Sequence, residues 1–288
     1  MIYGALEAGG TKMVCAIGDE NGKIVDQISI PTKTPDETMP KIIEYFKDKD
    51  IKALGIATFG PVDVHPESPT YGHILETPKT AWIGFDLLGC LKDALNVPAG
   101  IDTDVNGSLI GEATWGAAKD VSDAVYITIG TGVGGGIISG GKIVHGMLHP
   151  ELGHMKMVRD SSDNYTGKCP FHGTCLEGLA SGPAIEDRWG VSAKELVDRD
   201  EVWELESYYI AQAIANLIFI ISPKKIILGG GVMHQEQLFP LIRKKVLDNL
   251  NGYFKLDELS DIDNYIIPAS LNDDQGIMGA IKIAIDAV

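Results

Sequence analysis

The chain has 288 residues, of which 44% are hydrophobic and 22% charged, and its formal net charge is −16 at pH 7. This length and composition are typical of a globular protein with two modest cores, and the acidic balance disfavours nucleic acid or an anionic membrane surface as a partner because like charges repel. There is neither an apolar run of about 18 residues nor a basic and then apolar N-terminal region, and only four cysteines are present, so we expect a cytoplasmic protein without a disulfide framework.

The first part of the chain predicts a three-stranded meander followed by alternating strands and helices. Strands are expected at residues 2–8, 12–18 and 23–30, because short runs rich in β-branched residues are separated by Gly9-Gly10 and by Asn21-Gly22. The elements expected after them are a helix from Thr34-Pro35, a strand at 52–58, a loop at 59–86, a helix at 87–95, a strand at 98–103 and a helix at 105–115.

The same pattern restarts near residue 124. The expected elements are strands at 124–130, 136–139 and 142–145, a glycine-rich turn at 131–135, an irregular segment at 146–182, a helix at 205–221, a strand at 225–228, a helix after Gly229-Gly230-Gly231, a strand at 265–268 and a helix at 274–288. Two meanders with glycine-rich first turns indicate a duplicated α/β architecture with both turns on one cleft. The predicted domains are residues 1–117 and 118–273, with the final helix, about residues 274–288, free to pack back on the first.

The first glycine-rich turn has the sequence E-A-G-G-T-K. Backbone N–H groups of such a turn can hold phosphate oxygens. Gly9 and Gly10 allow close approach, Thr11 adds a hydroxyl group and Lys12 adds a cation. A plain hairpin turn with an exposed lysine explains the segment equally well.

The second glycine-rich turn, residues 130–135, contains the spacing G-x-G-x-x-G. A dinucleotide fingerprint requires a helix after this turn, whereas a strand is expected here, so we interpret the turn as a phosphate loop. Gly229-Gly230-Gly231 ends a strand and would let a flat ring lie against the backbone. A helix cap is the alternative for that triplet.

Asp104 is the candidate general base. It lies where the strand at 98–103 ends and a helix begins, so an N-cap role would explain an isolated aspartate there. Phosphoryl transfer to a hydroxyl, however, needs a carboxylate between the phosphate loops to accept the hydroxyl proton. The predicted topology places Asp104 in that position, with Asn106 able to orient the sugar or the carboxylate.

A third cluster has the composition of a metal site. His154, Cys169, His172 and Cys175 supply two imidazoles and two thiolates, which match a closed tetrahedral zinc site. The alternative is two buried thiols and two surface histidines. With no position left for water, the zinc would be structural and would order the loop that carries Glu151 and Glu177.

Taken together, these segments resemble the ROK family (repressors, open reading frames and sugar kinases) of actin-like ATPase folds. The most specific parts are E-A-G-G-T-K, T-D-V-N, I-G-T-G-V-G-G-G, E-L-G-H and C-L-E-G-L-A-S-G. The resemblance implies duplicated actin-like (ribonuclease H-like) domains and a hexose kinase that uses ATP and magnesium and is usually dimeric. By position it implies the following roles: Asp104 as the base; Glu151, His154 and Glu177 as sugar-hydroxyl contacts; Thr11, Lys12, Thr131 and Gly132 as phosphate contacts; and Pro183, Gly230, Gly231 and Val232 near the adenosine.

Two departures from the family pattern bear on the substrate. Glucokinase-like members have Glu-Asn-Asp at the base, whereas this chain has Asp102-Thr103-Asp104, and its zinc loop is C-x-x-H-G-x-C instead of C-x-C-G-x-x-G-C. The loop and E-L-G-H are similar to the bacterial fructokinase branch, so fructose is the expected sugar. Glu7 stands where many members have aspartate. Glucose, mannose and N-acetylmannosamine kinases, a ROK-type transcriptional repressor and an inactive sugar sensor are the alternatives.

Overall fold

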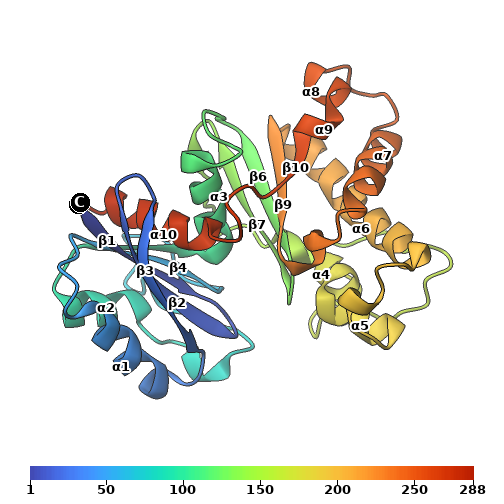
Figure 1. The fold of residues 1–288 in the computed structure, drawn as a ribbon. Coiled ribbons are helices and arrows are strands. Elements are labelled where there is room, and N and C mark those ends of the chain that lie inside the picture. Colours follow the sequence, from blue (N-terminus) through green and yellow to red (C-terminus); the bar gives the residue numbers. More distant parts are fainter. The chain divides into compact units, whose positions relative to one another are not determined.

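Two five-stranded sheets organise the chain in the computed structural model, which describes residues 1–288 (Figure 1). The chain divides into two compact units. The first unit comprises residues 1–120, 143–150 and 270–288, and the second comprises residues 121–142 and 151–269. The prediction that the chain forms domains divided between residues 117 and 118 stays a prediction.

The sheet of the first unit has the order β3-β2-β1-β4-β5. Its strands are β1 (Ile2–Ala8), β2 (Lys12–Asp19), β3 (Ile24–Pro31), β4 (Leu54–Thr58) and β5 (Ala99–Thr103). The first three form an antiparallel meander, and β4 and β5 run parallel to β1. The inner strand β4 is buried along its whole length because helices cover both faces of the sheet.

Large and small residues separate the two faces of this sheet. Leu6, Met13 and Ile56 pack in one core with helices α1 (Pro35–Phe46) and α2 (Leu87–Leu95). Alanines dominate the other face, where helix α10 (Gln275–Asp286) lies against β1, β4 and α3 (Asp104–Trp115), as Figure 1 shows.

Helix α10 is part of the core of the first unit. Ile277 and Ile281 are 1% and 0% exposed, and burial of such side chains contributes roughly 1.5–3 kcal/mol each. The helix crosses α3 at close range, since a Cβ atom added to Gly279 would lie 1.7 Å from the carbonyl oxygen of Gly107. Only glycine fits at this crossing. The close crossing also places the N-terminal end of α10 at the end of β1.

The sheet of the second unit has the order β10-β9-β6-β7-β8. Its strands are β6 (Ala124–Ile129), β7 (Val133–Ser139), β8 (Lys142–Ile143), β9 (Lys225–Gly229) and β10 (Ile266–Pro268). The strands β6, β7 and β8 correspond to β1, β2 and β3, and with this correspondence the two sheets have the same strand order. In the second sheet β9 and β10 run parallel to β6, just as β4 and β5 run parallel to β1 in the first. The predicted duplicated α/β fold is confirmed.

The remaining helices belong mostly to the second unit. They are α4 (Leu176–Ala180), α5 (Gly182–Trp189), α6 (Asp200–Ile221), α7 (Leu238–Leu250), α8 (Asp257–Ser260) and α9 (Ile262–Tyr265), with single 3-10 turns η1 (Thr80–Trp82) in the first unit and η2 (Leu152–His154), η3 (Ala193–Glu195) and η4 (Gly231–His234) in the second. None of the helices combines the length and apolar character that a membrane span requires.

Several predicted boundaries were wrong, among them the end of the strand expected at 142–145, because β8 ends at Ile143. Strand β7 begins at Val133 instead of residue 136, because Leu152 packs directly on Gly135 and the glycines continue the ladder with β6. Helix α6 begins at Asp200 instead of residue 205, with acidic residues in its first turn, where they favour a helix. The glycine triplet leads into the turn η4, and the regular helix begins only at Leu238.

Candidate active site

The first glycine turn, residues 9–12, is held by a neighbouring strand end. Thr32 donates its hydroxyl group to the carbonyl oxygen of Gly9 at 2.7 Å and its N–H to that of Thr11 at 3.0 Å. Gly9 cannot carry a side chain, since a Cβ atom would lie 2.7 Å from the carbonyl oxygen of Lys12. Thr11 and Lys12 are exposed, so a fixed turn presents a hydroxyl group and a cation to solvent.

Carboxylates gather beside this turn at one edge of the sheet. Strands β1, β4 and β5 are parallel, so their carboxyl ends meet there, which is where α/β sheets bind ligands. Burial and the nearby charges of Asp104 and Asp274 raise the pKa of Glu7 to about 7, against the opposing charge of Lys12. The first unit thus brings together Glu7, Lys12, Asp104 and Asp274.

Asp104 lies in the first turn of α3 and does not cap it. The N-cap is Thr103, whose hydroxyl oxygen accepts the N–H of Asn106 at 3.1 Å. The N-cap role that was the alternative for Asp104 is therefore filled by Thr103. Asp104 is partly exposed, and its Oδ1 accepts the N–H of Val105 at 2.9 Å.

The side chain of Asn106 is fully buried, whereas its predicted contact with a sugar called for an accessible side chain. It is 0% exposed, its amide Nδ2 donates to Asp102 at 2.7 Å, and its Oδ1 has no hydrogen-bond partner. The amide is thus held by Asp102, with one buried acceptor left over.

In the second unit, Glu177 lies on the second glycine turn. Its Oε2 accepts the N–H of Val133 at 3.1 Å, and a Cβ atom on Gly132 would lie 2.8 Å from the same oxygen. Cys175 and Glu177 begin helix α4, whose start therefore sits beside Gly132. The predicted phosphate contacts Thr131 and Gly132 and the predicted sugar contact Glu177 are brought together.

The residues predicted near the adenosine also converge on this turn. Gly182 donates its N–H to the carbonyl oxygen of Gly130 at 2.8 Å, which fixes the start of α5 and Pro183 beside the turn. A Cβ atom on Gly130 would lie 3.7 Å from the N atom of Gly231, and one on Gly182 would lie 3.8 Å from Val232. Residues from the starts of α5 and η4 thus lie against one turn.

Glu151 and His154 stand at the two ends of the turn η2. Burial and the neighbouring charge of Glu177 raise the pKa of Glu151 to about 7. Because Glu151 keeps solvent-exposed surface, water screens part of this effect. His154 is half-buried, and its Nδ1 faces the cysteine cluster.

The four predicted metal ligands form one cluster in the second unit. The Sγ atom of Cys175 is 3.6 Å from Nδ1 of His154, and Sγ of Cys169 is 3.7 Å from Nδ1 of His172 and 3.9 Å from Nδ1 of His154. All four ligand atoms lie within 4.8 Å of one another, and both cysteines are free thiols. Ligands of a tetrahedral zinc ion are about 3.3–3.8 Å apart, so these residues fit one with a small contraction.

Comparison with known proteins agrees with this arrangement. The sequence matches the ROK family over residues 3–287. The chain belongs to the ROK family. It is 50% identical over 284 residues to a fructokinase from Pediococcus pentosaceus, covering 99% of this chain and 98% of that one, and 42% identical over 284 residues to a fructokinase from Lactococcus lactis subsp. cremoris, covering 98% and 96%.

A solved structure shares the fold. The ROK hexokinase from Thermus thermophilus superposes with a TM-score of 0.81 at 23% identity, and the match covers 99% of this chain and 98% of that one. At this level of identity the likeness concerns the fold alone. The predicted family and fold are both confirmed.

In this ROK-family chain, the contact between His145 and Asp102 was not predicted from the sequence. His145 Nε2 lies 2.9 Å from Asp102 Oδ2, and this hydrogen bond raises the pKa of His145. From the same segment, residues 143–150, His149 accepts the N–H of Val62 at 3.3 Å. The two histidines themselves were the available indication, but their partners are distant in sequence.

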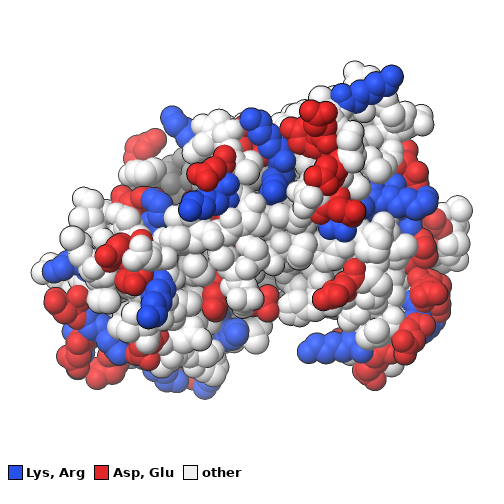
Figure 2. Space-filling view, turned by 45° about the horizontal axis from the view of Figure 1, so that its top comes forward, with Lys and Arg blue, Asp and Glu red and all other residues white.

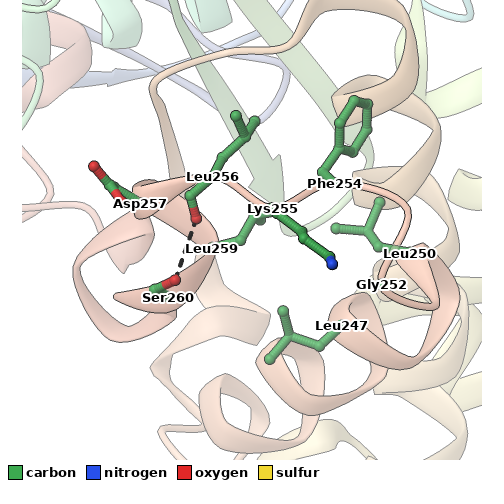
Figure 3. A pocket seen from close by; sticks show the side chains of 9 residues that line it. All are labelled: Leu247, Leu250, Gly252, Phe254, Lys255, Leu256, Asp257, Leu259 and Ser260. Atoms are coloured by element: carbon green, nitrogen blue, oxygen red, sulfur yellow. Dashed lines mark hydrogen bonds between the residues drawn. The ribbon is translucent and has the colours of Figure 1, made fainter.

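One cavity lies away from the predicted site residues. It has a volume of about 330 Å³ and lies between the C-terminal end of α7 and α8 in the second unit (Figure 3). Leu247, Leu250 and Leu256 line it together with Lys255 and Asp257. None of the residues expected to bind sugar, nucleotide or metal is among its lining residues.

The raised pKa of Glu7 predicts how stability depends on pH. The folded state holds this proton up to about pH 7, whereas an unfolded carboxyl releases it near 4.5, so the Glu7 contribution to stability falls as pH rises through that interval. Glu7→Gln should therefore raise the free energy of unfolding at pH 8 by about 1–3 kcal/mol and change it little at pH 4. Urea denaturation at both pH values measures this, with the exposed Glu67→Gln as a matched control; equal stabilities at pH 8 would contradict it.

Proposed function

We propose that this ROK-family chain is an ATP-dependent fructokinase, which converts ATP and D-fructose into ADP and D-fructose 6-phosphate. The observation that carries the proposal is identity of 50% and 42%, over nearly the full length, to two fructokinases. The site geometry is consistent with it, because one unit presents a carboxylate beside a glycine turn and the other places the starts of α5 and η4 against a second glycine turn.

In the proposed reaction, Asp104 accepts the proton of the fructose hydroxyl as its oxygen attacks the γ-phosphorus of ATP. A P–O bond to the sugar forms, the bond to ADP breaks, and the electron pair leaves with ADP. The other proposed roles are Asn106, Glu151, His154 and Glu177 for the sugar; Gly9, Gly10, Thr11, Lys12, Thr131 and Gly132 for the phosphates; and Pro183, Gly230, Gly231 and Val232 for the adenosine.

Two metal ions belong to the proposal. A magnesium ion would neutralise charge on the β- and γ-phosphates, and the carboxylates of Glu7 and Asp274 offer the oxygen ligands that it prefers. A structural zinc ion would be held by His154 together with Cys169, His172 and Cys175, which follow the pattern C-x-x-H-G-x-C. We further propose that the protein is a cytoplasmic homodimer.

The test of function is a panel of hexoses with ATP and magnesium, with ADP release as the readout. We expect kcat/KM for fructose to exceed that for glucose, mannose and N-acetylmannosamine by at least about tenfold, because one hydroxyl contact can dominate selectivity. Highest activity on another sugar would replace fructose in the proposal. Absence of ADP release with every sugar would favour the inactive sensor.

A DNA-binding repressor fits the surface less well. The net charge is −16, and on the face drawn in Figure 2 acidic and basic side chains are interspersed without a continuous basic patch. Proteins that bind DNA present such a patch to the phosphate backbone. Specific DNA binding in a gel-shift experiment would reverse this preference.

A further inference from the structure

A lysine that the sequence analysis passed over lies on the first glycine turn. A Cβ atom built on Gly10 would be 2.9 Å from Cε of Lys79 and 3.7 Å from its Nζ. Lys79 is 69 residues further along the chain, in the segment 59–86 that was expected only as a loop. Its ammonium group therefore reaches the backbone that was predicted to hold phosphate oxygens.

The loop that carries Lys79 is fixed to the same support as the glycine turn. The backbone carbonyl oxygen of Lys79 accepts the N–H of Trp82 at 2.8 Å, and the indole N–H of Trp82 donates to the carbonyl oxygen of Lys33 at 2.7 Å. Lys33 directly follows Thr32, which holds Gly9 and Thr11. One short segment thus anchors both the glycine turn and the lysine loop.

Trp82 makes this support rigid. It is 1% exposed and makes edge-to-face contacts with Phe59 at 5.9 Å and with Phe85 at 5.4 Å between ring centroids. Such packing holds the backbone at Lys79 in place, so the long side chain starts from a fixed point. A preorganised cation costs little reorganisation when a charge develops next to it.

Lys79 forms none of the ion pairs that engage other lysines of this unit, such as those of Lys33 with Glu37 and of Lys49 with Asp26. Lys79 is half-buried, so its charge is partly shielded from water. Exposed Thr11 and Lys12 belong to the same turn, so Lys79 adds a second cation to it, beside the carboxylates of Glu7, Asp104 and Asp274. An anion on this turn would supply the missing partner.

We propose that Lys79 is a phosphate-binding residue that contacts the γ-phosphoryl group of ATP and stabilises the charge on it during transfer. This inference rests on the proposed kinase function and adds a group to it. Lysine suits the role because its ammonium acts as a compact point charge on phosphate. A lysine that only covers Gly10 with its methylene groups is the competing explanation.

The variants Lys79→Met and Lys79→Arg separate these explanations. Methionine keeps the apolar stem over Gly10 and removes the charge, whereas arginine keeps the charge. Lys92→Met, at an exposed position of α2, is the matched control. Each protein is assayed for kcat with fructose and for binding of ATP and ADP by calorimetry in the presence of magnesium.

We expect Lys79→Met to lower kcat about 100-fold, the usual scale for loss of one charge-stabilising group, and to weaken ATP about tenfold while changing ADP less than about twofold. Lys79→Arg should recover at least about a tenth of the wild-type kcat, and Lys92→Met should match wild type. Wild-type kcat and an unchanged ATP-to-ADP affinity ratio in Lys79→Met would overturn the proposal, as would equal losses for both nucleotides.

The wild-type protein separates failure of this inference from failure of the proposed function. If it binds ATP without phosphorylating fructose, the proposed function fails, and the ATP-to-ADP affinity ratio of Lys79→Met still decides the role of Lys79. If it binds neither nucleotide, both proposals are overturned together.

Discussion

Replacing Asp104 with asparagine should lower kcat for fructose phosphorylation by at least about 100-fold, the usual scale for loss of a general base. Asparagine has nearly the same shape but does not accept the hydroxyl proton. The fold should persist, because the cap of α3 is made by Thr103 and not by Asp104. Steady-state kinetics with fructose and ATP measures kcat, and calorimetry measures ATP affinity, which should change little.

The control for this experiment is Asp93→Asn, an exposed aspartate of α2 in the same unit. It should leave kcat, KM and thermal stability unchanged. A near wild-type kcat in Asp104→Asn would remove Asp104 from the role of base. A low kcat with a matching loss of thermal stability would instead indicate damage to the fold.

Replacing Cys175 with serine should release the proposed zinc ion and lower the free energy of unfolding by more than about 3 kcal/mol. Serine suits this test because Cys175 is also the N-cap of α4, where its sulfur accepts the N–H of Gly178 at 3.5 Å. A serine oxygen preserves that cap, so the loss reports on the metal. Metal content by mass spectrometry and thermal denaturation with and without chelator provide the readout.

Cys90→Ser is the matched control, because Cys90 is a half-buried free thiol in the other unit. It should retain both metal content and stability. Chelation of the wild-type protein should abolish activity, since the ordered start of α4 carries Glu177 onto the second glycine turn. Full activity and an unchanged melting temperature in a verified metal-free sample would refute the structural role of zinc.

The sequence predicted most of the strands because their signals are local. Short apolar runs bounded by glycine turns located β1, β2, β6 and β9 and also the duplication. The start of β7 was misplaced, because glycines usually interrupt strands, whereas here Leu152 from a distant segment packs on Gly135 and stabilises the ladder. That contact is 17 residues away in sequence and leaves no local trace.

The candidate site likewise contains residues that the sequence predicted and residues that it did not. Asp104, the glycine turns and the Cys/His cluster could be proposed from the sequence because their residue types and spacings are those that a general base, a phosphate loop and a metal site require. His145 and Lys79 were missed, because each lies in a loop without periodicity and its partner, Asp102 or Gly10, is 43 or 69 residues away. The role of a residue in such a loop depends on contacts that only the folded structure shows.

The amino-acid sequence by itself determined the α/β duplication and the two glycine turns, since periodicity and spacing act over a few residues, and it supplied the predictions of the acid at position 104 and of the metal ligands. Only the tertiary structure decided that Thr103 caps α3, that α10 closes the first core and that Lys79 lies on the first glycine turn. The physical reason is that packing and hydrogen bonding join groups that chain order separates, and their free energy depends on distance in space.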